Sequence, residues 1–120
     1  MIIKKNNNLI RREGKEMILA TLDSIPEKKV IKTLGMVRGS CVKAKHIGKD
    51  IIAVLKNIVG GELKGYEELM NEAREAALER LVKEAEKMGA NAIIGIRFAT
   101  SSIMSGASEI LAYGTAVIIE

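Results

Sequence analysis

The sequence predicts an α+β fold in a single domain, and three observations support that interpretation. A long amphipathic helical pattern lies between runs of β-branched and aliphatic residues. The last two of these runs flank a loop of small polar residues, which is typical of an antiparallel hairpin. The length of 120 residues suits one domain and is too short for two ordinary ones. The predicted order is strand, strand, short helix, long helix, strand and strand.

Residues 1–16 are predicted to be a flexible basic tail, and residues 17–120 to form the domain. Of the chain's net charge of +4, the tail supplies +3, from five basic residues against two acidic ones: Lys4, Lys5, Arg11, Arg12 and Lys15 against Glu13 and Glu16. Such a segment is more often a flexible leader than a binding arm. Met17 follows it directly, so either Met1 or Met17 is a candidate start of the protein.

Two strands are predicted before the helices. Residues 17–22 form a short apolar run that ends at a turn cluster containing Pro26, which cannot donate to a strand ladder. Residues 30–42 are rich in β-formers and contain Gly35 and Gly39. Glycines at these positions predict a bulge or a close backbone approach rather than a flat strand.

Two helices are predicted next. Residues 49–59 place aliphatic side chains at spacings of three and four, and Gly60 and Gly61 end that pattern. Residues 66–88 form the long helix, in which small alanine side chains allow close approach to a sheet. Its apolar stripe consists of Tyr66, Met70, Ala73, Ala77, Leu81, Ala85 and Met88.

The last two strands are predicted at residues 90–99 and 110–119, joined by a loop over residues 100–108. Alternation along the first of them places Ile94, Ile96 and Phe98 on one face and Arg97 on the other. We expect Arg97 either to pair with Glu109 across the hairpin or to line an interface or pocket.

Composition excludes several classes of function. Aromatic residues are only 2% of the chain, so it cannot build the stacking platforms of single-strand nucleic-acid binders. Nucleic acid is therefore not an expected partner, although the basic tail keeps that alternative open. No segment is apolar and long enough to span a membrane, and one cysteine permits no internal disulfide. A cytoplasmic location is expected.

Candidate metal ligands are few. One cysteine and one histidine cannot complete a four-ligand zinc site within one chain. Cys41 and His46 are five residues apart, a spacing that does not put them on one face of a strand. The simpler interpretation is a buried thiol and a solvated imidazole. A metal site would need symmetry to bring copies of Cys41 together.

Catalytic patterns are also missing from the sequence. The segment 59–65 lacks the Gly-Lys-Ser/Thr ending of a phosphate loop, and the serines of residues 101–108 show no nucleophile elbow. A hinge between two helices is the simpler interpretation of Gly60 and Gly61, with anion binding at the helix start as the alternative. We therefore predict a non-enzymatic protein. Its candidate ligand or interface residues are Gly60, Gly61, Tyr66, Arg74 and Arg97.

Several motifs resemble the YbjQ-like family of small proteins, which is catalogued as heavy-metal-binding. The resemblance spans residues 17–120 and is carried by residues 35–39, 57–61, 66–67, 73–74, 77, 88–96 and 114–117. It implies a strand, helix, strand, strand core, with the long helix packed on an antiparallel sheet, and a pentameric ring. It also implies a divalent or soft metal as a candidate cofactor, with Cys41 and His46 as the ligands this chain offers. The chain departs from the family pattern at residues 40–46 and 101–108.

The expected function is that of an uncharacterised oligomeric module, binding a metal ion or small ligand at subunit interfaces. A purely structural or partner-binding assembly unit is the alternative. In both cases the expected partner is a second copy of the chain.

Overall fold

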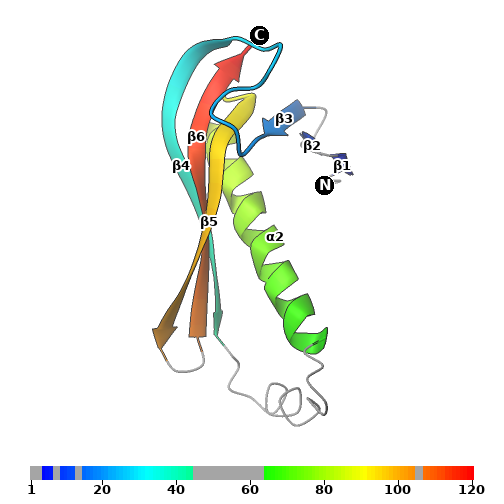
Figure 1. The fold of residues 1–120 in the computed structure, drawn as a ribbon, viewed down its shortest axis with the longest axis vertical. Helices are drawn as coiled ribbons and strands as arrows, with labels where there is room; N and C mark the ends of the chain where they lie inside the picture. The colour runs from blue at the N-terminus through cyan, green and yellow to red at the C-terminus, as the bar shows by residue number, and fades with distance from the viewer. Residues whose placement is uncertain (1–3, 7–8, 13–14, 45–63, 105–106) are drawn as a thin grey trace.

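The computed structural model describes residues 4–6, 9–12, 15–44, 64–104 and 107–120 (Figure 1). It confirms the α+β class. The strands are β1 (Lys4–Asn6), β2 (Leu9–Arg12), β3 (Lys15–Leu19), β4 (Val30–Ala44), β5 (Ala92–Met104) and β6 (Ala107–Ile119), and the helix is α2 (Lys64–Lys87). The helix predicted at residues 49–59, with Gly60 and Gly61, lies outside the described residues.

The strands form one sheet in the order β1-β2-β3-β5-β6-β4. All neighbouring pairs are antiparallel except β3 and β5, which are parallel, so the predicted antiparallel sheet is confirmed only for β5, β6 and β4. A parallel pair needs a long crossover connection, and the chain between β3 and β5 includes β4 and α2. Figure 1 shows α2 lying along one face of the long strands.

The hairpin of β5 and β6 has a much shorter connection than the sequence predicts. Register pairs continue to Met104 opposite Ala107, so strand structure replaces most of the expected loop over residues 100–108. Threonine is favoured in strands, and serine is not among the residues depleted from them. The small polar residues of segment 100–108 therefore did not indicate a loop, as the sequence analysis expected.

The main core lies between α2 and the sheet, as the alanine stripe predicts. Ala73, Ala77, Leu81 and Ala85 are completely or almost completely buried. A Cβ atom at Gly39 of β4 would collide with backbone atoms of Ala77 and Leu81 in the helix. The predicted close approach is confirmed at this glycine.

A β-bulge changes which residues of β5 face the helix. The register shifts between Ile94 and Arg97, and Gly95 adopts a left-handed φ of 64°. An extra residue in one strand reverses the alternation beyond it. Ile93 and Ile96 are consequently both buried in the main core, whereas simple alternation separates them. The bulge predicted around Gly35 is confirmed by a register shift between Thr33 and that glycine.

The other sheet face, which we call the outer face, is covered by described residues near one end. There Ala92, Val117 and Ile119 form a second buried cluster, with Ile25 from the connection between β3 and β4 packed against it. Farther along, outer-face residues of β4 and β6 are exposed or half-buried.

Strands β1 and β2 occur in the segment predicted to be a flexible tail. Leu9 to Arg12 pair with Lys15 to Ile18, and β1 pairs with β2. Strand β3 begins at Lys15, before Met17, and β2 pairs with its open side. The placement of the domain boundary at residue 17 stays a prediction.

Candidate functional site

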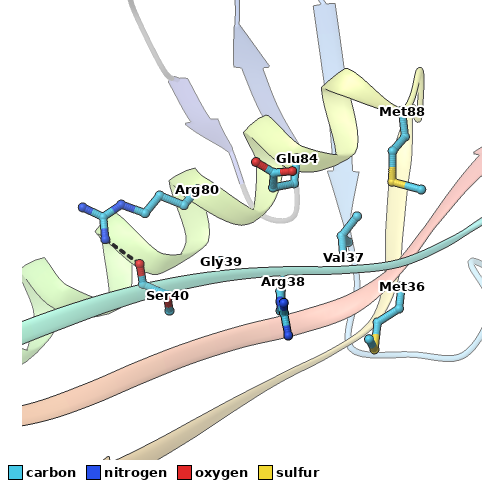
Figure 2. A pocket seen from close by; sticks show the side chains of 8 residues that line it. All are labelled: Met36, Val37, Arg38, Gly39, Ser40, Arg80, Glu84 and Met88. Carbon is cyan, nitrogen blue, oxygen red and sulfur yellow. Dashed lines mark hydrogen bonds between the residues drawn. The ribbon is translucent and has the colours of Figure 1, made fainter.

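Strand β4 is the end strand of the sheet, and this gives the fold an open edge. Among the described residues, β4 pairs only with β6, along one of its two sides. Nη1 of Arg80 in α2 donates a hydrogen bond to the backbone oxygen of Ser40 (Figure 2). That oxygen therefore points away from β6. Because backbone groups alternate in direction along a strand, those of Arg38 and Val42 point the same way.

A groove of about 480 Å³ runs beside this edge. Figure 2 shows Arg80, Glu84 and Met88 on the helix side of β4, with Met36 and Arg38 directed to the opposite side. The groove thus wraps around the strand edge rather than entering the core. Its lining residues are Met36, Val37, Arg38, Gly39, Ser40, Arg80, Glu84 and Met88.

Sequence reasoning missed this groove. Arg80 lies three residues after Ala77 in the polar part of the helical pattern, where a solvated side chain is the ordinary expectation. Its contact depends on β4 being the end strand, which neither periodicity nor spacing reveals. The Gly35 and Gly39 pair was the available signal, because it marked the segment over which helix and strand approach closely.

A second open edge occurs on β5. Strand β3 pairs with β5 only at Ala92 and Ile93. Two further backbone hydrogen bonds extend that contact into the residues after β3. The N–H groups of Gly95 and Ile96 donate to the backbone oxygens of Leu22 and Ala20, respectively. Beyond them, no described strand pairs with this side of β5 up to Met104.

Cys41 belongs to the main core. Its side chain is 4% exposed and faces α2 from β4. The thiol is therefore almost completely covered by its own chain. His46 lies outside the described residues, so the structure does not bring the two predicted ligands together.

The described residues do not fit a heavy-metal centre within one chain. In the described ranges, no group of three His, Cys, Asp or Glu side chains is placed to hold a metal ion. The sulfur atoms of Met36 and Met88 line the groove, but Figure 2 shows them on different sides of β4. Soft thioether donors are therefore present without being gathered.

The predicted ligand or interface residues are dispersed. Tyr66 is in the first turns of α2, and its side chain is outside the described part of the structure. Arg74 is exposed on α2 and donates from Nη1 to Oδ1 of Asn71 at 2.9 Å. The structure does not bring these two residues together with Arg97. Gly60 and Gly61 lie outside the described residues.

Arg97 has different partners from the one expected. Its Nη1 donates to the backbone oxygens of Thr21 and Ile96, both at 2.8 Å. Glu109 is opposite Ser101, four residues farther along β5, so the predicted pair with Arg97 is wrong. The bulge at Gly95 and the connection after β3 determine where the guanidinium group lies. Neither is visible in the alternation of the sequence.

The described helix is not a membrane span. Within the described residues, no helix is both long enough and apolar enough to cross a bilayer.

The chain is similar to many small proteins of one family. A family sequence model with the description "Putative heavy-metal-binding" matches residues 17–120. A UPF0145 protein of Methanosarcina acetivorans is 58% identical over 101 residues, which is 84% of this chain and 95% of the relative. A UPF0145 protein of Hahella chejuensis is 55% identical over 104 residues, covering 87% of this chain and all of the relative.

One solved structure is similar in fold. It is a protein of unknown function from Pediococcus pentosaceus, assigned to the DUF74 family, with a TM-score of 0.55 and 18% identity. The alignment covers 87% of this chain and 98% of that one. With a family match over more than four-fifths of its length and relatives above 50% identity, the chain belongs to the YbjQ-like family, also designated UPF0145.

Proposed function

We propose that the protein is a non-enzymatic, cytoplasmic, homo-oligomeric module that assembles through the open edges of its sheet and binds a small ligand beside the interface. The observation that carries this proposal is β4, a strand of 15 residues with one side open in the described structure. Long open edges are uncommon in monomeric proteins, because they pair with other chains.

Exposed apolar side chains support use of both edges. Met36 and Val42 on β4, and Phe98 and Ile103 on β5, are exposed large hydrophobic residues. Pairing strand to strand would remove part of this surface from water while satisfying outward backbone groups. Burial of this kind contributes roughly 25 cal/mol per Å² of apolar surface.

The two edges favour a ring over a two-fold dimer. A two-fold dimer uses the same surface on both copies, whereas a ring joins two different surfaces head to tail. The chain offers two different edges, on β4 and on the second half of β5. Five copies per ring is the number that the family resemblance implies, and it remains a proposal.

The groove would lie at the boundary between copies. Because it wraps around the β4 edge, a strand added there would form its missing wall. A metal is a second candidate ligand, since Met36 and Met88 supply thioether donors suited to soft ions such as Cu(I). One chain does not gather these sulfurs, so metal binding would depend on assembly.

Native mass spectrometry tests assembly and ligand content together. We expect an oligomer at micromolar concentration, and a 13 kDa monomer would contradict the proposal. Val42→Lys places a charge on the open edge and should favour the monomer. Leu22→Lys is the matched control, because Leu22 is 57% exposed against 52% for Val42 but lies between β3 and β4. Equal disruption by both variants would exclude the β4 edge as the interface.

A further inference from the structure

The helix packs over the end strand of the sheet, which leaves part of β5 uncovered on the same face. A Cβ atom at Gly39 of β4 would meet the helix backbone at Ala77 and Leu81, so α2 lies directly above this edge. Phe98 of β5 is paired with Ala112 of β6, which belongs to the main core, so the Phe98 ring also projects on the helix face. The Phe98 side chain is nevertheless 47% exposed. One copy of the chain therefore leaves an aromatic ring uncovered at its open β5 edge.

The β4 edge offers a position for such a ring. Arg80 of α2 is level with Gly39, since its carbonyl carbon is among the atoms nearest to a Cβ built on that glycine. From there the Arg80 side chain crosses the strand edge, and its Nη1 donates to the outward backbone oxygen of Ser40 (Figure 2). The guanidinium group therefore lies at the position that a strand added to β4 would take.

The two open edges have matching strand directions and levels. Strands β4 and β5 are each antiparallel to β6, so they are parallel to one another. A ring axis that runs along the strands preserves direction and level, and it places β5 of the next copy parallel to β4. Gly39 and Phe98 are both opposite Ala112, which makes them level within one copy. The partner's Phe98 would therefore arrive beside Gly39, on the helix face.

The backbone groups of the two edges are also in the phase that a parallel pair requires. In a parallel ladder, a residue whose groups point to the added strand lies opposite a residue whose groups point away. The backbone oxygen of Ser40 points outward. The N–H of Ile96 donates to Ala20, away from β6, so alternation turns the groups of Phe98 outward and those of Ala99 inward. Ser40 and Ala99 are level across β6, so the ladder can form without a register shift.

We propose that residues 98–102 of one copy pair in parallel with residues 39–43 of the next, and that the partner's Phe98 forms the missing wall of the groove beneath Arg80. This inference rests on the edge assembly proposed above and names the strands that meet. A guanidinium group stacks on an aromatic ring through its plane and donates hydrogen bonds from its edge, so Arg80 can keep its bond to Ser40. A carbonyl oxygen has two lone pairs, so Ser40 can also accept a hydrogen bond from the added strand.

The paired segment has a definite end. On the β3 side of β5, the backbone oxygens of Thr21 and Leu22 already accept hydrogen bonds from Arg97 and Gly95. A strand from another copy therefore cannot pair with β5 before residue 98. The earlier part of β4, which includes Met36, remains outside the paired segment, and the methionine end of the groove stays open for a ligand.

Paired cysteines test the contact and its register. Across the proposed interface Ser40 and Ala99 are neighbours with backbones about 4.8 Å apart, which permits a disulfide. Within one copy β6 separates them by roughly 10 Å, which does not. The variant Ser40→Cys/Ala99→Cys, oxidised with glutathione disulfide, should therefore form covalent oligomers on a non-reducing gel. Ser40→Cys/Ser101→Cys is the matched control, displaced by two residues on the same face, and should form few. Both pairs carry Cys41→Ala, which removes the chain's own thiol.

Two further variants test the ring and the cation. In native mass spectra over a dilution series, Phe98→Ala should raise the concentration at which the oligomer dissociates at least about tenfold. Ile31→Ala is the matched control, because Ile31 is 54% exposed on β4 before the paired segment, and it should change that concentration less than about twofold. Arg80→Met should weaken assembly about threefold in the wild type but have little effect in the Phe98→Ala background, since the contact is already lost there.

The outcomes separate this inference from the proposed assembly. Oligomers that do not cross-link through Ser40→Cys/Ala99→Cys, or that cross-link equally well through Ser101→Cys, would overturn the pairing and leave assembly itself standing. Equal effects of Phe98→Ala and Ile31→Ala would overturn the placement of the ring. A monomer at every concentration would overturn both proposals.

Discussion

Replacing Gly39 by alanine should be the most damaging single-methyl change in the described fold. The added Cβ would collide with the backbone at Ala77 and Leu81, which cannot rotate away as a side chain can. Ordinary contact begins at 3.4 Å, so α2 would have to move from β4 by roughly 1 Å. A gap of that size forfeits a quarter to a half of the dispersion energy of each facing atom pair.

We expect Gly39→Ala to cost about 3 kcal/mol, at the upper end for overpacking of a core. For a domain of this size that lowers the thermal midpoint by about 10 °C. Gly89→Ala is the matched comparison. A Cβ there meets nothing within 4 Å, and only its φ of 83° opposes the change, so about 1 kcal/mol is expected.

Urea denaturation followed by circular dichroism, at one fixed protein concentration, measures both variants on the same scale. The reasoning is refuted if Gly39→Ala is within 0.5 kcal/mol of the wild type, a margin typical of neutral surface substitutions. It is also refuted if Gly89→Ala is the more destabilising of the two, since backbone strain would then outweigh the collision with the helix.

Three further outcomes follow from the structure. Deleting residues 1–16 should change the thermal midpoint by no more than about 2 °C. Among the described strands, β1 and β2 pair only with each other and with β3. A large drop in the midpoint would show that the deleted segment packs on the core. Cys41→Ala should cost about 1 kcal/mol through lost core packing and leave copper affinity unchanged, so loss of tight copper binding would restore Cys41 as a ligand. Arg97→Gln removes the hydrogen bond to Thr21 and should lower the free energy of unfolding by about 1 kcal/mol. It should also speed amide hydrogen exchange at Gly95, whose N–H donates to the neighbouring Leu22. Unchanged exchange would mean that Arg97 does not hold the segment between β3 and β4 against β5.

The sequence correctly predicted those elements in which buried residues recur at a regular spacing. The long helix was recoverable because Ala73, Ala77, Leu81 and Ala85 recur on one stripe, and all four are buried in the main core. Gly35 and Gly39 indicated a bulge or a close backbone approach. The bulge occurs at Gly35, and the close approach to the helix occurs at Gly39.

Features set by contacts distant in sequence were not recoverable. A pair with Glu109 was one of the two expectations for Arg97, and it is wrong because the register of the hairpin places Glu109 opposite Ser101. Arg80 reaches Ser40, 40 residues away in the chain, only because β4 is the end strand. The spacing of residues along one strand does not reveal how that strand is aligned with its neighbours in the sheet.

The order of strands in the sheet also determines when the molecule can fold during synthesis. Strand β6 lies between β5 and β4 in the sheet, yet it is synthesised after both of them. Until then β4 has neither strand partner nor finished core, and its apolar residues remain available to other nascent chains. The backbone that follows β6 also takes part, since Glu120 and Lys29 exchange two backbone hydrogen bonds of 2.9 and 3.1 Å. The sheet beneath α2 can therefore close only once β6 has been synthesised, which leaves β4 and β5 waiting for the strand that joins them.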